Sequence, residues 1–367
     1  IIKLTPQAIE FTPASVKLQF LAGKEAVAMA VMQNKPGVVA AYPITPSTVA
    51  VEILAEKIAQ GEFDAELVIT ESEYSAQAAL IGAQAMGVDT FTSTASQGLL
   101  LMHELLPVAG GFGLPIVMYI SARAITRRDL SIFNDLSDTL MQRDSGWIQI
   151  YASSSQELYD MMLMAPLIAK SIKAPIMVIA DGFAVSHTRE LIKVLTEEEV
   201  MQLHKDISLP KAQDWLGTFG PGSGPASYTE GVIHQARLME QGTLKIDRIF
   251  KAFTQLTGRS YELIKEYGPD DANVGLMVMG VTANIAQVAS QQVSSLGLKA
   301  KVIVPKVFIP FPKDELIHSL RGVESVYIVD LAITPGGTGA PLFNMVTAAL
   351  INQKTRPMLM NAVLGLG

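Results

Sequence analysis

Short apolar segments alternate with longer amphipathic ones along most of this chain, and that alternation limits the fold more than any other feature of the sequence. The apolar segments of the first half cover residues 37–42, 66–71, 90–94, 115–121, 147–152 and 175–180. Helices are expected between them, over residues 48–60, 72–87, 99–110 and 156–171, with Ser47 as a cap for the first. Continuous apolar strands separated by helices are typical of a parallel sheet covered on both faces. The sequence therefore predicts an α/β fold with a doubly wound parallel sheet.

The regular alternation stops near residue 189 and resumes near residue 272. A long amphipathic helix is predicted from about Gly231 to Tyr267, with breaks at Gly242 and Gly258. Beyond it, strands are expected over 272–280, 299–306, 325–331 and 356–365, and helices over 282–297, 313–322 and 340–353. We therefore predict two domains, 1–245 with a connecting segment over 189–245, and a smaller parallel α/β domain over 246–367.

Composition excludes several classes of function. The chain contains no cysteine, so it offers no disulfide, no thiol nucleophile and no cysteine ligand for zinc or an iron–sulfur cluster. Its net charge is −7, and it lacks the dense block of Lys and Arg that is typical of a protein that binds nucleic acid. No membrane span is expected, because His103, Glu104, prolines and glycines interrupt the most apolar stretch. These features predict a cytoplasmic protein, and 49% apolar residues indicate that further surface is buried against partners.

Three polar residues follow predicted strands directly, where ligands bind in open α/β sheets. Thr45 lies between two prolines in the loop "YPITPST", and Glu73 lies at the junction between a strand and a helix of small residues. A carboxylate held there among apolar groups would have a raised pKa and could share a proton with a heterocycle nitrogen. Arg123 follows an apolar strand and could bind a substrate carboxylate through two hydrogen bonds. The alternatives are a helix cap for Glu73 and a surface salt bridge for Arg123.

The glycine clusters and histidines give weaker signals. "GPGSG" (Gly220–Gly224) lacks the strand, helix and lysine of a phosphate-binding loop and indicates a plain loop. "PGGTGAP" (Pro335–Pro341) lies between a predicted strand and helix, where backbone N–H groups could hold an anion, although a structural turn is the simpler interpretation. No two histidines have the i,i+4 spacing of a zinc site, so no metal site is expected, and His187 alone follows a strand end.

Several segments together resemble the 2-oxoacid:ferredoxin oxidoreductase family. They are "AYPITPSTVAVEILAE", "TESEYSAQAALIGAQAMG", "TFTSTASQGLLLMHELL", "SIFNDLSD" and "DGFAVSH". The resemblance covers nearly the whole chain and is strongest to α subunits of the pyruvate-oxidising branch. It implies that residues 1–245 form a thiamine diphosphate pyrimidine-binding domain and that residues 246–367 form a domain similar to the C-terminal domain of transketolase.

The resemblance also implies a reaction and a set of partners. Members of this family decarboxylate a 2-oxoacid with thiamine diphosphate, pass electrons to ferredoxin and transfer the acyl group to coenzyme A, reversibly. For this chain that implies pyruvate, with acetyl-CoA and CO2 as products. A β subunit would share the thiamine diphosphate and supply the Mg²⁺ side, and it, a γ subunit and a ferredoxin-like δ subunit would carry the [4Fe–4S] clusters. The whole would assemble as a dimer of such heteromers.

Residue roles follow from the same resemblance. Glu73 matches the glutamate that contacts the aminopyrimidine ring of thiamine, Thr45 the threonine that bonds the substrate, and Arg123 the arginine that holds the 2-oxoacid carboxylate. The cofactor-binding positions that it implies are Pro43, Ile44, Thr45, Glu73, Ser96 and Gln97.

The chain also departs from the family at a few positions. Tyr74 stands where relatives have histidine, Ile309 where an arginine is common, and Arg127-Arg128-Asp129 replaces a more neutral stretch. The small Thr45 argues against a dicarboxylate such as oxalate. 2-Oxoglutarate or a branched 2-oxoacid stays open as the substrate, and a non-catalytic scaffold subunit stays open as the function, because a fold does not fix a function.

Overall fold

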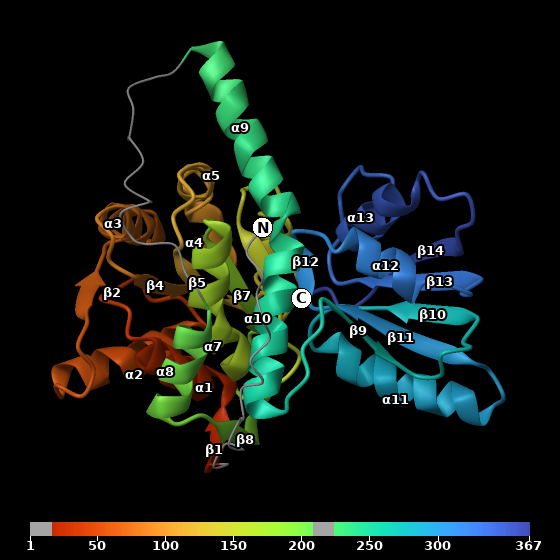
Figure 1. The fold of residues 1–367 in the computed structure, drawn as a ribbon, viewed down its shortest axis with the longest axis horizontal. Helices are drawn as coiled ribbons and strands as arrows, with labels where there is room; N and C mark the ends of the chain where they lie inside the picture. Colours follow the sequence, from red (N-terminus) through yellow and green to blue (C-terminus); the bar gives the residue numbers. More distant parts are fainter. Residues whose placement is uncertain (1–16, 208–223) are drawn as a thin grey trace, which may run out of the picture.

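The computed structural model describes residues 17–207 and 224–367. Within these ranges, the largest sheet has seven strands in the order β12-β6-β7-β5-β4-β2-β3 (Figure 1). All are parallel except β12, which runs antiparallel to β6. The strands are β2 (Val38–Ala41), β3 (Glu66–Ile69), β4 (Thr90–Thr94), β5 (Val117–Ala122), β6 (Ile148–Tyr151), β7 (Ile176–Asp181) and β12 (Val307–Ile309). The predicted doubly wound parallel sheet is confirmed.

Helices pack on both faces of this sheet and bury two separate cores. One face carries α1 (Gly23–Asn34), α2 (Thr48–Ala59) and α7 (Ser155–Ile172), and the other α3 (Glu73–Ala85), α4 (Ser96–Leu101), α5 (Leu106–Gly111) and α6 (Ser137–Leu140). Strands β4, β5, β6 and β7 are buried on both faces, which explains the largely apolar sequences of β5 and β7; β4 (TFTST) and β6 (IQIY) also bury polar side chains. The single helix predicted over residues 99–110 is wrong. It is two helices, because Pro107 lacks an N–H and lies in the first turn of α5.

The region after β7 begins with a small antiparallel sheet that closes on the start of the chain. Strand β1 (Lys17–Ala22) pairs with β8 (Arg189–Val194), and α8 (Glu197–Asp206) follows. The next helices are α9 (Pro225–Glu240), which projects from the body in Figure 1, and α10 (Gly242–Thr257). The predicted breaks at Gly242 and Gly258 are confirmed, and Gly258 ends α10 at a φ of +72°. The predicted extension to Tyr267 is wrong, because Ile264–Tyr267 forms strand β9.

The last third of the chain forms a five-stranded sheet in the order β14-β13-β10-β11-β9, antiparallel only at β9. Its other strands are β10 (Val274–Met277), β11 (Ala300–Pro305), β13 (Ser325–Asp330) and β14 (Met358–Val363). Helix α11 (Thr282–Ser295) covers one face, and α12 (Lys313–Ser319) and α13 (Pro341–Leu350) cover the other. The predicted second parallel α/β unit is confirmed. No helix in the two described ranges is long and apolar enough to cross a bilayer.

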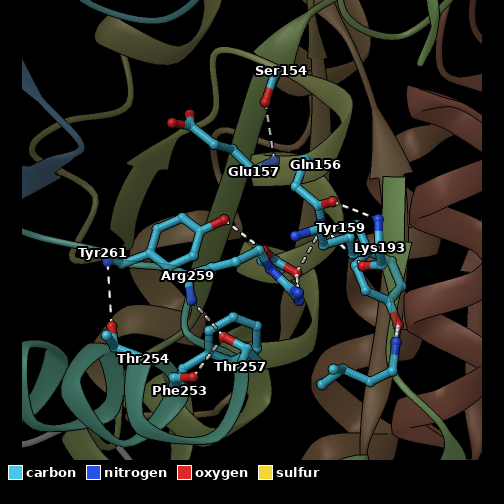
Figure 2. A network of polar contacts seen from close by, with 12 residues as sticks. Ser154, Gln156, Glu157, Tyr159, Lys193, Phe253, Thr254, Thr257, Arg259 and Tyr261 are labelled. Atoms are coloured by element: carbon cyan, nitrogen blue, oxygen red, sulfur yellow. Dashed lines mark hydrogen bonds and ion pairs between the residues drawn. The ribbon is translucent and has the colours of Figure 1, made fainter. Parts of the chain in front are cut away.

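Several connections among the described residues tie the two units together. Strand β12 follows β11 but pairs with β6 in the large sheet. The buried Lys306 donates to Glu157 at 2.7 Å and to Ser153 at 2.8 Å. Arg259 makes two hydrogen bonds to the fully buried carboxylate of Asp160, at 2.6 and 2.8 Å, and Figure 2 shows this network around Arg259 and Tyr261.

The position of the domain boundary stays a prediction. Helix α10 spans the predicted boundary at 245/246, and its buried residues beyond that boundary join the core of the first unit: Ile246, Ile249, Phe250 and Phe253.

Candidate functional site

The loops that follow β2, β3, β4 and β5 meet at one edge of the large sheet, because these strands are parallel neighbours in the order β5-β4-β2-β3. They carry Thr45, Glu73, Ser96 and Arg123 respectively. The carboxyl edge of a parallel sheet is where α/β folds bind ligands. The structure therefore brings together residues that are up to 78 positions apart in the sequence.

The loop after β2 is closed by its own hydrogen bond. Ser47 donates from its Oγ to the carbonyl oxygen of Ile44 at 2.8 Å, and Thr45 precedes a cis proline, Pro46. Ser47 occupies the N-cap position of α2, but its side chain accepts no N–H from the helix. The predicted capping role is therefore wrong, because the hydroxyl is used to shape the loop. The side chains of Pro43 and Thr45 are exposed at the site.

Arg123 is locked between two of these loops. Its side chain is buried, and it donates from Nη1 to the carbonyl oxygen of Thr45 and from Nη2 to Oε1 of Gln97, both at 2.7 Å. The surface salt-bridge alternative is wrong, because the guanidinium is buried and its partners are neutral oxygens. Burial lowers the pKa of Arg123 from its usual value. The guanidinium retains further N–H groups beyond these two bonds, and the one at Nε has no partner within the described part of the chain.

Glu73 is the first residue of α3, and the residue is only 6% exposed. The helix-cap alternative is wrong, because Ser72 is the N-cap residue and accepts the N–H of Ser75 at 3.3 Å. Burial raises the pKa of the Glu73 carboxyl, and the N–H of its own backbone offsets this only in part. The raised pKa expected from the sequence is thus confirmed in direction.

Helix α4 approaches Glu73 through a glycine. A Cβ added to Gly98 would lie 2.5 Å from Oε1 of Glu73 and 2.5 Å from Oγ1 of Thr94. Real Cβ atoms do not come this close to other heavy atoms, so only glycine allows the first turn of α4 to cover the carboxylate. The Glu73 carboxyl therefore lies against Gly98, one residue from the Gln97 that holds Arg123.

Sequence reasoning missed Asp138, the residue that fixes two of the loops. Asp138 lies in α6 and is fully buried. Its Oδ2 accepts the backbone N–H of Ser96 at 3.0 Å and of Arg123 at 3.2 Å, and its Oδ1 accepts that of Thr139 at 2.7 Å. Burial raises the pKa of Asp138 to about 7, although the three backbone bonds lower it. The only sequence signal was its place in "SIFNDLSD", to which no role was assigned.

The remaining candidates divide into two groups. Ser96 has a left-handed backbone (φ +45°), and its Oγ contacts Oε1 of Gln97 at 2.6 Å and the carbonyl oxygen of Ala124 at 2.7 Å, so it supports Gln97 and Arg123. Pro43 and Ile44 share the loop of Thr45, and neither makes a side-chain hydrogen bond to the others. His187 stacks on Phe183 with ring centroids 5.0 Å apart and is outside the group.

Of the two glycine clusters, only Pro335–Pro341 lies fully within the described residues. The segment Pro335–Pro341 does connect a strand to α13, as predicted, but Asp330 accepts the N–H groups of Leu342 at 2.7 Å and Phe343 at 3.2 Å. These two N–H groups, in the first turn of α13, are therefore not free for an anion; within the segment, Gly337 donates to Thr334 and Ala340 to Asn361. "GPGSG" lies outside the described residues except for Gly224, the N-cap of α9. Within the described ranges, no cluster of three or more His, Cys, Asp or Glu residues could hold a metal ion.

Comparison with known families gives two matches in tandem. A family model described as "pyruvate flavodoxin/ferredoxin oxidoreductase, thiamine diP-bdg" matches residues 29–230, and one described as "pyruvate:ferredoxin oxidoreductase core domain II" matches residues 272–367. The first of these covers every residue of the site described above.

Relatives over nearly the full chain carry two names. Pyruvate synthase subunit PorA of Pyrococcus abyssi is 39% identical over 94% of this chain and 88% of its own length. PorA of Thermotoga maritima is 37% identical over 94% of this chain and 89% of its own length. Ketoisovalerate oxidoreductase subunit VorA of Pyrococcus abyssi is 37% identical over 98% and 91%.

Solved structures share the fold at low identity. A 2-oxoglutarate:ferredoxin oxidoreductase of Magnetococcus marinus has a TM-score of 0.70 at 21% identity, covering 96% of this chain. This chain spans only 63% of the length of that protein. A split-gene transketolase has a TM-score of 0.57 at 12% identity, covering 94% of this chain and 88% of its own. With the family models and the full-length relatives, the comparisons establish that this chain belongs to the pyruvate flavodoxin/ferredoxin oxidoreductase family.

Proposed function

We propose that this chain is the thiamine-binding catalytic subunit of a pyruvate:ferredoxin oxidoreductase. The proposed reaction converts pyruvate and coenzyme A into acetyl-CoA and CO2, and ferredoxin receives the electrons. The single observation that carries the proposal is the joint placement of Glu73, Thr45 and Arg123 at one sheet edge, in a domain whose family model is described as thiamine diphosphate-binding. The full-length relatives named pyruvate synthase support the choice of pyruvate.

The residues at this edge fit an aminopyrimidine ring. The Glu73 carboxyl is buried, its pKa is raised, and within the described residues its polar partner is its own backbone N–H. The raised pKa makes the carboxyl a better proton acceptor than an ordinary glutamate, and the exchange of a proton at Oε is what a ring nitrogen requires. Thiamine diphosphate, when bound, would supply the carbon nucleophile and electron sink for the decarboxylation. The bare backbone of Gly98 leaves the space that the carboxyl occupies.

Arg123 and Thr45 are the groups that we propose for the substrate. The bonds from Arg123 to Thr45 and Gln97 fix the plane of the guanidinium before substrate arrives, so that little rotamer entropy is lost on binding. Its remaining N–H groups can bind the 2-oxoacid carboxylate, and the exposed hydroxyl of Thr45 can donate to the 2-oxo oxygen.

Other components would complete the enzyme. The chain contains no cysteine, so ligands for [4Fe–4S] clusters would come from the partner subunits. The β subunit would also hold Mg²⁺ and the diphosphate, and a γ subunit would complete each heteromer of a cytoplasmic dimer. The name PorA, given to a subunit, supports a complex of several chains.

A second candidate is the same chemistry on a branched 2-oxoacid. The observation that favours it is the similarity to ketoisovalerate oxidoreductase subunit VorA. That subunit is 37% identical to this chain, and pyruvate synthase subunit PorA of the same organism is 39% identical.

The test is turnover by the native complex purified through this chain. Reduction of a low-potential dye is followed with pyruvate, 2-oxoisovalerate, 2-oxoglutarate and oxalate, each with and without coenzyme A. Reduction that is fastest with pyruvate and depends on coenzyme A is expected. Fastest reduction with 2-oxoisovalerate supports the second candidate. No reduction with any of them, in a complex that contains thiamine diphosphate and iron, contradicts both and favours a scaffold role.

A further inference from the structure

Helix α3 packs on strand β4 through a row of buried polar side chains, which is unusual inside a protein core. We call this row the polar seam. It consists of Glu73, Gln77 and Gln84 on α3 and of Thr90, Thr92 and Thr94 on β4. The alternating threonines share one face of β4, because successive side chains of a strand point to opposite faces. Except at Glu73, the residues of the polar seam are at most 3% exposed.

Contacts at both ends fix how the two elements are aligned. At one end, Thr90 donates from Oγ1 to Oε1 of Gln84 at 2.8 Å. At the other end, Oε1 of Glu73 and Oγ1 of Thr94 both lie 2.5 Å from the position of a Cβ on Gly98. Helix α3 therefore runs antiparallel to β4, with Glu73 at the carboxyl edge of the sheet.

The middle of the polar seam lies next to Glu73, on the side away from the carboxyl edge of the sheet. Gln77 is about 6 Å along the helix from Glu73, on the same face, since four residues rise 1.5 Å each. Thr92 is about 7 Å along the strand from Thr94. Gln77 and Thr92 are thus at the same level, directly beneath Glu73.

The polar atoms at this level have no partner within the chain. Nε2 and Oε1 of Gln77, Oγ1 of Thr92 and Oγ1 of Thr94 are all buried, and none makes a hydrogen bond to a described residue. Buried polar groups are nearly always paired, with protein or with ordered water. Four unpaired polar atoms on facing elements provide the two to four partners that a buried water requires.

We propose that Gln77 is a positioning residue for Glu73, and that its amide and the hydroxyls of Thr92 and Thr94 bind a buried water that donates to the Glu73 carboxylate. The water would accept from Nε2 of Gln77 and from a threonine hydroxyl, and its own hydrogen would reach Oε1 of Glu73. This role of Gln77 in catalysis rests on the function proposed above. The water site itself does not.

Few other charged groups surround Glu73. Glu71 precedes α3 and is exposed, Arg123 is engaged with Thr45 and Gln97, and Asp138 is held by three backbone N–H groups. None of them contributes to the pKa of Glu73, which is governed by its burial. A bond from water would stabilise the ionised form, so its loss should raise the pKa of Glu73.

The experiment uses Gln77→Met and Thr92→Val in the assembled holoenzyme, with Gln84→Met as the matched control. Each substitution keeps the shape of the side chain and removes its polar atoms. Gln84 lies two turns further along the same helix face and bonds Thr90, away from the site. We expect the limb of the pH–turnover profile that Glu73 governs to move up by about one pH unit in the first two variants, and to stay unmoved in the control.

Two further measurements separate this inference from the proposed function. Infrared difference spectra of the complex against Glu73→Gln follow the Glu73 carboxyl directly, whether or not pyruvate is turned over. The same upward shift is expected in them, with melting temperatures of Gln77→Met no lower than that of the wild type. A high-resolution crystal structure should show water between Gln77, Thr92 and Glu73. A direct Gln77–Thr92 bond without water, or an unmoved Glu73 titration in both variants, overturns the inference.

Discussion

Replacement of Asp138 by asparagine should remove a large part of the pH dependence of stability. Burial raises the pKa of this carboxyl from 3.8 to about 7. The folded chain therefore binds one proton more than the unfolded chain between about pH 4 and pH 7. Under linkage, the free energy of unfolding falls as pH rises through that window and is level above it. A difference of roughly three pKa units corresponds to about 4 kcal/mol of unfolding free energy, which the wild type loses across this window. Asp138→Asn does not show this loss, because asparagine does not titrate.

The same substitution should also damage the site. The carboxylate accepts three backbone N–H groups, from Ser96, Arg123 and Thr139, whereas asparagine has one oxygen and one donor NH2 group. At least one N–H is therefore left facing a donor, at a cost of about 1–3 kcal/mol. Because two of these N–H groups belong to the loops that carry Gln97 and Arg123, turnover at pH 7 should fall.

Urea unfolding of the wild-type chain and of Asp138→Asn at pH 4.5, 5.5, 6.5 and 7.5 provides the assay. Subtracting the two free energies at each pH cancels the contribution of every other carboxyl group. The wild type should have its greatest advantage at pH 4.5, and the advantage should shrink by several kcal/mol by pH 7.5. A difference that stays constant across the series would refute the reasoning, since it would show that Asp138 titrates alike in the folded and unfolded chains.

Four further predictions concern the site and the connection between the two units. Glu73→Gln should reduce turnover to nearly nothing while gel filtration shows an intact complex, because the amide can neither accept nor return a proton at Oε; normal turnover would contradict the proposed role. Arg123→Lys should raise the KM for the 2-oxoacid about tenfold or more with a smaller change in kcat, since lysine has no fork to join Thr45, Gln97 and a carboxylate; a pure kcat effect would argue against substrate binding. Gly98→Ala should impair turnover and thiamine diphosphate binding, measured by fluorescence titration, because its Cβ would displace the Glu73 carboxyl. Arg259→Leu should lower stability by about 3–5 kcal/mol in urea unfolding, because Asp160 would stay buried without its cation; a change below 1 kcal/mol would show that the pair contributes little.

Much of the fold and of the candidate site could be predicted because both depend on local patterns. Strand β4 is found at the predicted residues 90–94, since a short β-branched run bounded by glycine and a helix leaves few alternatives. Thr45, Glu73 and Arg123 could be placed together because residues that follow parallel strands must meet at one edge.

The features that could not be predicted depend on long-range contacts. Asp138 accepts hydrogen bonds from backbone N–H groups up to 42 residues away, and no spacing in the sequence indicates these contacts. Strand β12 follows β11 after one residue, and its choice of β6 as a partner is made by the packing of the two units. Strand β9 was missed because the amphipathic pattern continues past the break at Gly258 into an edge strand with similar alternation.

The pairing of β12 with β6 has a consequence for how this gene product can be divided. A fragment that stops before Val307 would keep the whole candidate site, but would leave β6 with a free row of N–H and C=O groups along a strand that is buried in the intact chain. Exposed edges of that kind recruit other strands and lead to aggregation. A fragment cut or fused between the two family matches should therefore aggregate unless it retains Val307–Ile309. By supplying this strand, the second unit protects the first unit from aggregation.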